Sequence, residues 1–210
     1  MRRILTAVLC LALLLSGCVP REQDALLGTW YATVDLSDAI NGDFADDPAL
    51  GDYVNVTGFC FPLTLAFSAD GTYCVRADRS GLGSALAELK AQLAAAMEQY
   101  VQSLLDGQQR QISARDYLAA MGLTPEDLLD HAYTEETVEK MLSAMDSQGN
   151  FQVEEGKLFL SNDVRYAVAT DCWELYRVEG NKLTVEAGGM DSPYAELIYP
   201  MEYTRLVEEE

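Results

Sequence analysis

The sequence predicts an α+β protein: an antiparallel β-barrel of about eight strands that carries an inserted α-helical segment. Three observations predict it. Apolar and polar residues alternate with a period of two in short stretches joined by tight turns, which is typical of antiparallel hairpins. In the middle of the chain the period lengthens to that of a helix. The strand pattern then returns, and so many strands usually close into a barrel or sandwich, which removes exposed edges.

A strand and a hairpin are expected in the first part of the barrel, which we place at residues 28–82. The first strand, residues 28–34, is rich in β-branched and aromatic side chains. In the hairpin, large apolar residues occupy every second position of residues 59–67, and residues 72–76 form the returning strand. Gly71 lies in the turn between them, where a tight loop requires the positive φ that glycine adopts without steric cost.

The acidic segment between these strands, residues 35–52, is predicted to be a turn-rich loop. Asn41-Gly42 and Asp47-Pro48 are strong turn signals within it. Its aspartates do not follow the spacing of a calcium loop, and the chain contains no Cys-x-x-Cys motif. We therefore expect no metal site and no cofactor.

A helical insertion is expected over residues 83–149. Apolar residues recur every three or four positions from residue 84 to 104, which predicts a long helix. Three shorter helices should begin after Ser113, Thr124 and Thr134, whose side-chain oxygens can accept hydrogen bonds from free backbone amides. The glycine at the end of the segment is expected to stop the last helix.

The barrel is expected to resume over residues 150–207. Its two predicted hairpins each have a glycine in the turn, and the last strands are interrupted by a proline. The expected strands are residues 151–154, 157–161, 172–178, 182–187, 196–199 and 201–207.

The first residues predict a lipoprotein signal peptide over residues 1–17. Arg2 and Arg3 precede an apolar run, Ile4 to Leu15, that is too short to span a bilayer. The Leu-Ser-Gly-Cys sequence ending at Cys18 resembles the lipobox of bacterial lipoproteins, in which the cysteine sulfur receives a diacylglyceryl group. The alternative is an ordinary signal peptide in which this cysteine is incidental.

We therefore expect the protein on the outer face of the cell membrane, anchored by lipid on Cys18, with residues 18–27 as a polar tether. Two acyl chains make such an anchor stable, whereas one binds only reversibly. Loss of Arg2 and Arg3 with the signal peptide takes the formal net charge from −20 to −22. This acidity argues against nucleic acid as a partner and against electrostatic docking on anionic lipid.

Three cysteines remain besides Cys10 and Cys18. Cys60, Cys74 and Cys172 would all lie outside the cytoplasm, where a disulfide is permitted. One disulfide with a free thiol and three small buried side chains are both consistent with the sequence.

Four short motifs resemble those of lipocalin-like bacterial lipoproteins. They are Gly-Thr-Trp at 28–30, Phe-Ser-Ala-Asp-Gly-Thr-Tyr at 67–73, the hairpin at 176–185 and the closing strand at 199–206. With the lipobox and the helical insertion, the mature chain is similar to a group of uncharacterised lipocalin-like lipoproteins of Gram-positive gut bacteria. That group has no settled function, so the resemblance implies a lipocalin-like barrel and not an activity.

The resemblance also implies that Trp30 of the first strand packs at the closed end of the barrel beneath Arg205 of the last strand. Such a cation–π contact contributes roughly 0.5–2 kcal/mol, depending on burial. We interpret Trp30, Arg205 and Gly71 as structural residues.

Barrels of eight strands either hold one small ligand or fill with side chains. We name Phe67, Tyr73, Trp173 and Tyr176 as candidate ligand-binding residues, with an ordinary packed core as the alternative. An interior without a cavity larger than about 300 Å³ would argue against a small ligand.

A catalytic site has little support. His131, the single histidine, lies in a predicted helix with no nucleophile placed beside it, and no phosphate-binding or dinucleotide-binding glycine motif is present. We therefore expect a non-enzymatic binding module for a small apolar ligand or a protein partner rather than an enzyme such as a hydrolase. The alternative is an envelope structural or interaction protein that takes no small ligand and whose helical insertion docks a partner.

Overall fold

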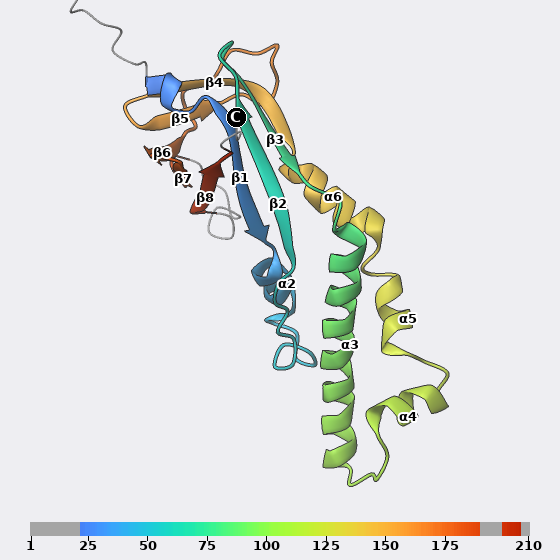
Figure 1. The fold of residues 1–210 in the computed structure, drawn as a ribbon. Coiled ribbons are helices and arrows are strands. Elements are labelled where there is room, and N and C mark those ends of the chain that lie inside the picture. Colours follow the sequence, from blue (N-terminus) through green and yellow to red (C-terminus); the bar gives the residue numbers. More distant parts are fainter. Residues whose placement is uncertain (1–21, 190–198, 207–210) are drawn as a thin grey trace, which may run out of the picture.

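A computed structural model describes residues 22–189 and 199–206, and its eight strands form one closed antiparallel barrel (Figure 1). Each strand pairs with the next in sequence, and β8 pairs with β1 to close the ring. The predicted α+β barrel with a helical insertion is therefore confirmed. The strands are β1 (Gly28–Asp35), β2 (Cys60–Phe67), β3 (Thr72–Ala77), β4 (Ser147–Glu154), β5 (Lys157–Leu160), β6 (Glu174–Glu179), β7 (Lys182–Glu186) and β8 (Met201–Arg205).

The longest strand pairing joins β1 and β2. It runs from Gly28 opposite Phe67 to Asp35 opposite Cys60. Along β2 the large apolar residues are buried and the residues between them are more exposed, so the period of two in the sequence does separate an inner from an outer face. Gly71 has a φ of 85° in the turn from β2 to β3.

The helices of the insertion lie between β3 and β4, and the longest of them extends away from the barrel (Figure 1). The caps expected from the sequence are confirmed. Ser113, Thr124 and Thr134 each accept a hydrogen bond of 3.1 Å from the backbone amide three residues further on. The helices are α3 (Leu82–Gly107), α4 (Ala114–Ala120), α5 (Pro125–Asp130) and α6 (Glu135–Met145).

One predicted loop contains a helix. Residues 35–52 include α2 (Ser37–Phe44), which buries Ile40 against the core. Asn41, expected to lie in a turn, instead holds the helix in place. Its side-chain nitrogen donates to the Val56 carbonyl at 3.0 Å, and its side-chain oxygen accepts from the Val56 amide at 2.7 Å. A contact between distant residues thus overrides the local turn signal.

Gly149 lies inside a strand and not at the end of a helix, because β4 already begins at Ser147. A Cβ atom on Gly149 would lie only 1.6 Å from the carbonyl oxygen of Ser161. This glycine is therefore required by the close approach of two backbones, which is the other common reason for glycine in a strand.

One end of the barrel is filled by side chains. The short 3₁₀ helix η1 (Glu22–Ala25) leads into Leu26, which is fully buried, as is Trp30. The Trp30 indole nitrogen donates to the Leu26 carbonyl at 2.7 Å. The guanidinium carbon of Arg205 lies 4.3 Å from the centre of the Trp30 ring, and Arg205 also donates to the carbonyl of Ala25. The structure thus places Arg205 over Trp30, as the resemblance implied.

The expected signal peptide (residues 1–17), Cys18 and the beginning of the tether lie outside the described residues, as does most of the strand expected at residues 196–199. Within the described part, no helix has both the length and the apolar character needed to cross a bilayer.

Candidate functional site

The barrel interior contains a cavity of about 550 Å³. Its walls are mainly apolar and come from the barrel and from the end of the helical insertion. They include Leu65 of β2, Leu158 of β5, Val185 of β7, Met201 of β8 and Met145 at the end of α6. The volume exceeds the limit of about 300 Å³ below which a small ligand would be excluded.

The cavity reaches the barrel end opposite η1, and on the other side it extends as far as Phe67 and Tyr73, which pair next to the turn from β2 to β3. In an antiparallel barrel the start of one strand and the end of the next meet at the same end. The lining residues Ser147 at the start of β4, Leu160 at the end of β5 and Glu174 at the start of β6 therefore mark one end. Gly71 and Gly156, in the turns beside η1, mark the other.

Three of the four candidate ligand-binding residues line the cavity. Phe67, Tyr73 and Trp173 are part of its wall, and the Tyr73 hydroxyl forms a 2.7 Å hydrogen bond with the Ser147 hydroxyl. Tyr176 is not part of the wall, although its ring packs against the core. Burial and the nearby carboxylate of Glu22, a residue of η1, raise the pKa of Tyr176.

Trp173 is fixed at the rim of the cavity by three contacts. The Gly189 amide donates to the Trp173 carbonyl at 2.9 Å. A Cβ atom on Gly189 would come within 2.5 Å of the Trp173 ring, so only glycine fits against it. The ammonium nitrogen of Lys157 lies 4.7 Å from the centre of the ring, which is a cation–π distance.

A half-buried acid also faces the cavity. Glu174 and Tyr199 both line it, and the Tyr199 hydroxyl donates to Oε1 of Glu174. Burial raises the pKa of Glu174, and the hydrogen bond from Tyr199 opposes that effect only in part. Burial, followed by the charge of Glu174, raises the pKa of Tyr199 and Tyr203 as well.

Glu174 is not among the candidate ligand-binding residues expected from the sequence, although the sequence contains a signal for it. In the expected strand 172–178 the alternation places Glu174 on the same face as Tyr176 and Val178. The structure shows that this is the inner face, since those three residues are more buried than the residues between them. An acid on the apolar face of a strand is therefore the pattern that could have identified this part of the site.

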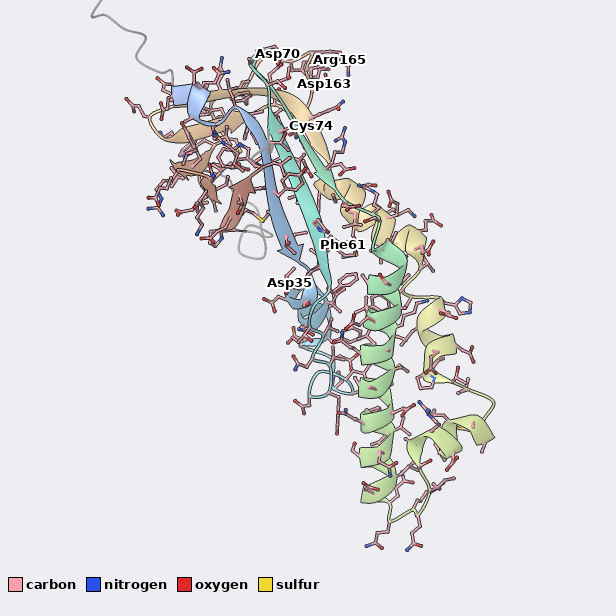
Figure 2. The ribbon with its side chains drawn as sticks, in the orientation of Figure 1. Asp35, Phe61, Asp70, Cys74, Asp163 and Arg165 are labelled. Carbon is pink, nitrogen blue, oxygen red and sulfur yellow. The ribbon has the colours of Figure 1, made fainter. Side chains whose placement is uncertain are left out.

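The three cysteines are free thiols, so the possible disulfide among them is not formed in this structure. Cys60 lies opposite Asp35 on β1, and Cys74 lies opposite Ala66 on β2. Figure 2 shows Cys74 well separated along the β-ribbon from Asp35, the neighbour of Cys60. Cys172 is exposed and belongs to the cavity wall.

His131 is exposed at the end of α5 and is not part of the cavity wall. Among the residues that the structure describes, no group of three or more histidine, cysteine, aspartate or glutamate side chains is arranged to hold a metal ion. The polar groups in the cavity wall can orient a ligand, and the apolar walls can cover it.

Comparison of the chain with protein-family models, with curated proteins and with solved structures found no match. The structure supports the resemblance to lipocalin-like lipoproteins at the level of the closed eight-stranded antiparallel barrel.

Proposed function

We propose that this protein is a non-enzymatic binding module whose barrel holds one small, largely apolar ligand, and that lipid on Cys18 anchors it to the outer face of the cell membrane. The observation that carries the binding role is the cavity of about 550 Å³. Ligand pockets typically measure about 300–1,000 Å³ and combine apolar walls with a few polar groups that orient the ligand. The cavity has both properties.

The anchor is supported by the sequence at Cys18 and fits the architecture of the barrel. The described chain enters at η1, beside the filled end, whereas the cavity lies toward the opposite end. A tether that continues from η1 to Cys18 would therefore attach the barrel to the membrane by its filled end.

Binding is tested with N-phenylnaphthylamine, a neutral apolar dye whose fluorescence rises in apolar surroundings. We expect saturable binding of one dye per protein. Val75→Trp should abolish it, because Val75 lines the cavity. Arg76→Trp is the matched control, since it adds the same ring at the next position of β3, where the side chain is exposed. No saturable signal, or unchanged binding by Val75→Trp, would refute the binding role.

The anchor has a separate test. Cys18→Ser should move the protein from the membrane fraction to the soluble fraction and prevent incorporation of labelled palmitate. Cys10→Ser, within the expected signal peptide, is the matched control and should change neither result. A Cys18→Ser protein that is processed normally and stays in the membrane fraction would refute the anchor without affecting the binding role.

A second candidate function is favoured by the surface of the helical insertion. Several large apolar side chains are exposed there, including Leu104, Met121 and Leu128, which are 47%, 50% and 45% exposed. Exposed apolar side chains indicate a protein docking site where they form one contiguous patch. If the insertion docks a protein partner, Met121→Ser with Leu128→Ser should abolish crosslinking to that partner in cells and leave dye binding unchanged.

A further inference from the structure

One group in the cavity is not explained by an apolar ligand alone, and that group is Glu174. It stands at the start of β6 directly opposite Leu158, which is 1% exposed. Its side chain lines a cavity whose other walls are mostly apolar. A carboxyl group in such surroundings loses its hydration, which is costly unless another partner replaces the water.

The described residues supply one partner for Glu174, and it carries no positive charge. Oε1 accepts the Tyr199 hydroxyl, and Oε2 has no hydrogen-bond donor among the described residues. Among the described residues, the other ionisable groups around this carboxyl group are Tyr73, Tyr203 and the Cys172 thiol, and none of them can carry a positive charge.

No basic residue compensates the acid within the described part of the chain, where the ion pairs leave Glu174 out. Lys157 lies on the neighbouring strand, but it is opposite Leu175 and stacks on the Trp173 ring. Residues 190–198, outside the described part, contain Asp191 and Glu196 but no lysine, arginine or histidine.

A half-buried carboxylate that lacks a cation among the described residues is a suitable binding group for a cation from outside the protein. A single buried charge is strongly unfavourable, whereas a paired and hydrogen-bonded charge is tolerated. The Tyr199 hydroxyl holds one carboxyl oxygen in place and leaves the other available to a ligand. The aromatic rings of Tyr73 and Tyr203 in the same wall can add cation–π attraction.

We propose that the barrel binds an apolar ligand that carries one protonated amine, with the ammonium group paired to Glu174 beside Tyr199 and the apolar body against the aliphatic wall. This inference rests on the proposed small-ligand function and names the ligand class. Burial raises the pKa of Glu174, and an ammonium ion beside the carboxyl group would act in the opposite direction by favouring the carboxylate.

The test compares three ligands that share one alkyl chain: decylamine, decanol and decanoate. Each is used to displace N-phenylnaphthylamine from the full mature protein at neutral pH, below the concentration at which micelles form. We expect decylamine to displace the dye at a concentration about tenfold lower than decanol, and decanoate to be the weakest. An advantage of this size corresponds to about 1.4 kcal/mol.

Glu174→Gln isolates the charge, because glutamine keeps an oxygen that accepts the Tyr199 hydroxyl. The variant should lose the preference for decylamine while decanol displaces the dye as before. Glu186→Gln is the matched control, since Glu186 is an exposed acid on the adjacent β7, and its preference for the amine should equal that of the wild type. Tyr199→Phe should weaken the preference in part, and circular dichroism verifies that each variant is folded.

The outcomes separate this inference from the proposed function. If decanol and decylamine displace the dye equally well, or if Glu174→Gln keeps the amine preference, the amine inference is wrong and the small-ligand function stands. If the dye itself does not bind to the wild-type protein, both fail.

Discussion

The two ends of this barrel are made from the same eight strands but differ in what occupies them. Beside η1 the interior is filled by fully buried side chains, including Leu26, Trp30 and Leu183, and Arg205 stacks on the indole ring. Toward the opposite end the strands surround a cavity of about 550 Å³ with Glu174 in its wall. One end is packed like a protein core, and the other leaves room for a ligand.

This difference suggests that one end of the sheet contributes mainly to stability and the other mainly to binding. The free energy gained by burial comes mostly from side chains in close contact, because an empty cavity forfeits those contacts. We therefore expect the filled end to dominate stability, and the hollow end to tolerate changes in volume and to determine binding. Four substitutions test this comparison.

The largest effect is expected at the centre of the filled end. Trp30→Ala should lower the free energy of unfolding by about 3–5 kcal/mol, because it removes a fully buried aromatic ring and leaves a cavity. Denaturant titration followed by circular dichroism measures the loss. Trp173→Ala, at the rim of the cavity, should cost clearly less, and equal losses would contradict the proposed difference between the two ends.

An added ring should act differently at the two ends. Leu183→Trp overpacks a fully buried position and should cost about 1–3 kcal/mol of stability. Val75→Trp places the same ring in the cavity, where there is room, and should change the unfolding midpoint much less while blocking dye binding. If Val75→Trp is the more destabilising of the two, the cavity is not available space.

The next effect concerns the polar junction between the barrel and α6. Asp146 accepts the Ala77 amide at 3.0 Å and pairs with Arg79 at 2.8 Å. Asp146→Asn should cost about 1 kcal/mol at neutral pH, a typical contribution for one hydrogen-bonded polar contact. Glu139→Gln, which alters the more exposed partner of Arg79, is the control and should cost less.

The loss of stability in Asp146→Asn should depend on pH, and its direction follows from the pKa of Asp146. Burial alone would raise the pKa of Asp146, but the Ala77 amide and Arg79 outweigh it, and the pKa is lowered from 3.8. The folded protein therefore gains stability from ionised Asp146 above pH 3.8 and loses it as the pH falls through the lowered value. The difference between wild type and Asp146→Asn should shrink in acid, as thermal unfolding at several pH values would show.

The smallest effect on stability is expected at Glu174, and its pH dependence is opposite to that of Asp146. The pKa of Glu174 is raised above 4.5 by burial, so the folded protein binds this proton more tightly than the unfolded chain. Its contribution to stability is complete below pH 4.5 and is lost as the pH rises through the pKa that Glu174 has in the folded protein. Glu174→Gln should therefore be slightly more stable than wild type at neutral pH and not below pH 4.5. A variant that is less stable at neutral pH would show that the carboxylate is well compensated.

The parts of the fold that could be predicted were those with local causes. Alternation along β2 identified a strand with one buried face, and Ser113, Thr124 and Thr134 marked helix starts because a cap bonds within its own turn. Gly71 was recognised from the turn that requires it.

The predictions that were wrong concern residues whose contacts are distant in the sequence. The Asn41-Gly42 turn signal was overridden by the bonds between Asn41 and Val56, and Gly149 serves a close approach to Ser161 that no local pattern reveals. Of the residues in the cavity wall, Trp173 is a candidate ligand-binding residue from the sequence because it is aromatic. Glu174 is not, because an acid is usually assigned to the surface.

The sequence by itself determined the antiparallel hairpins, the place of the helical insertion between them, three helix caps and a barrel of about eight strands, because these follow from periodicity and short-range bonding. Only the tertiary structure decided that one end of the barrel is packed and the other hollow. Packing density depends on how side chains from all eight strands meet in space, and neighbours in the sheet such as Leu158 and Glu174 are far apart in the sequence. The same closure of the barrel places the half-buried Glu174 in the cavity wall.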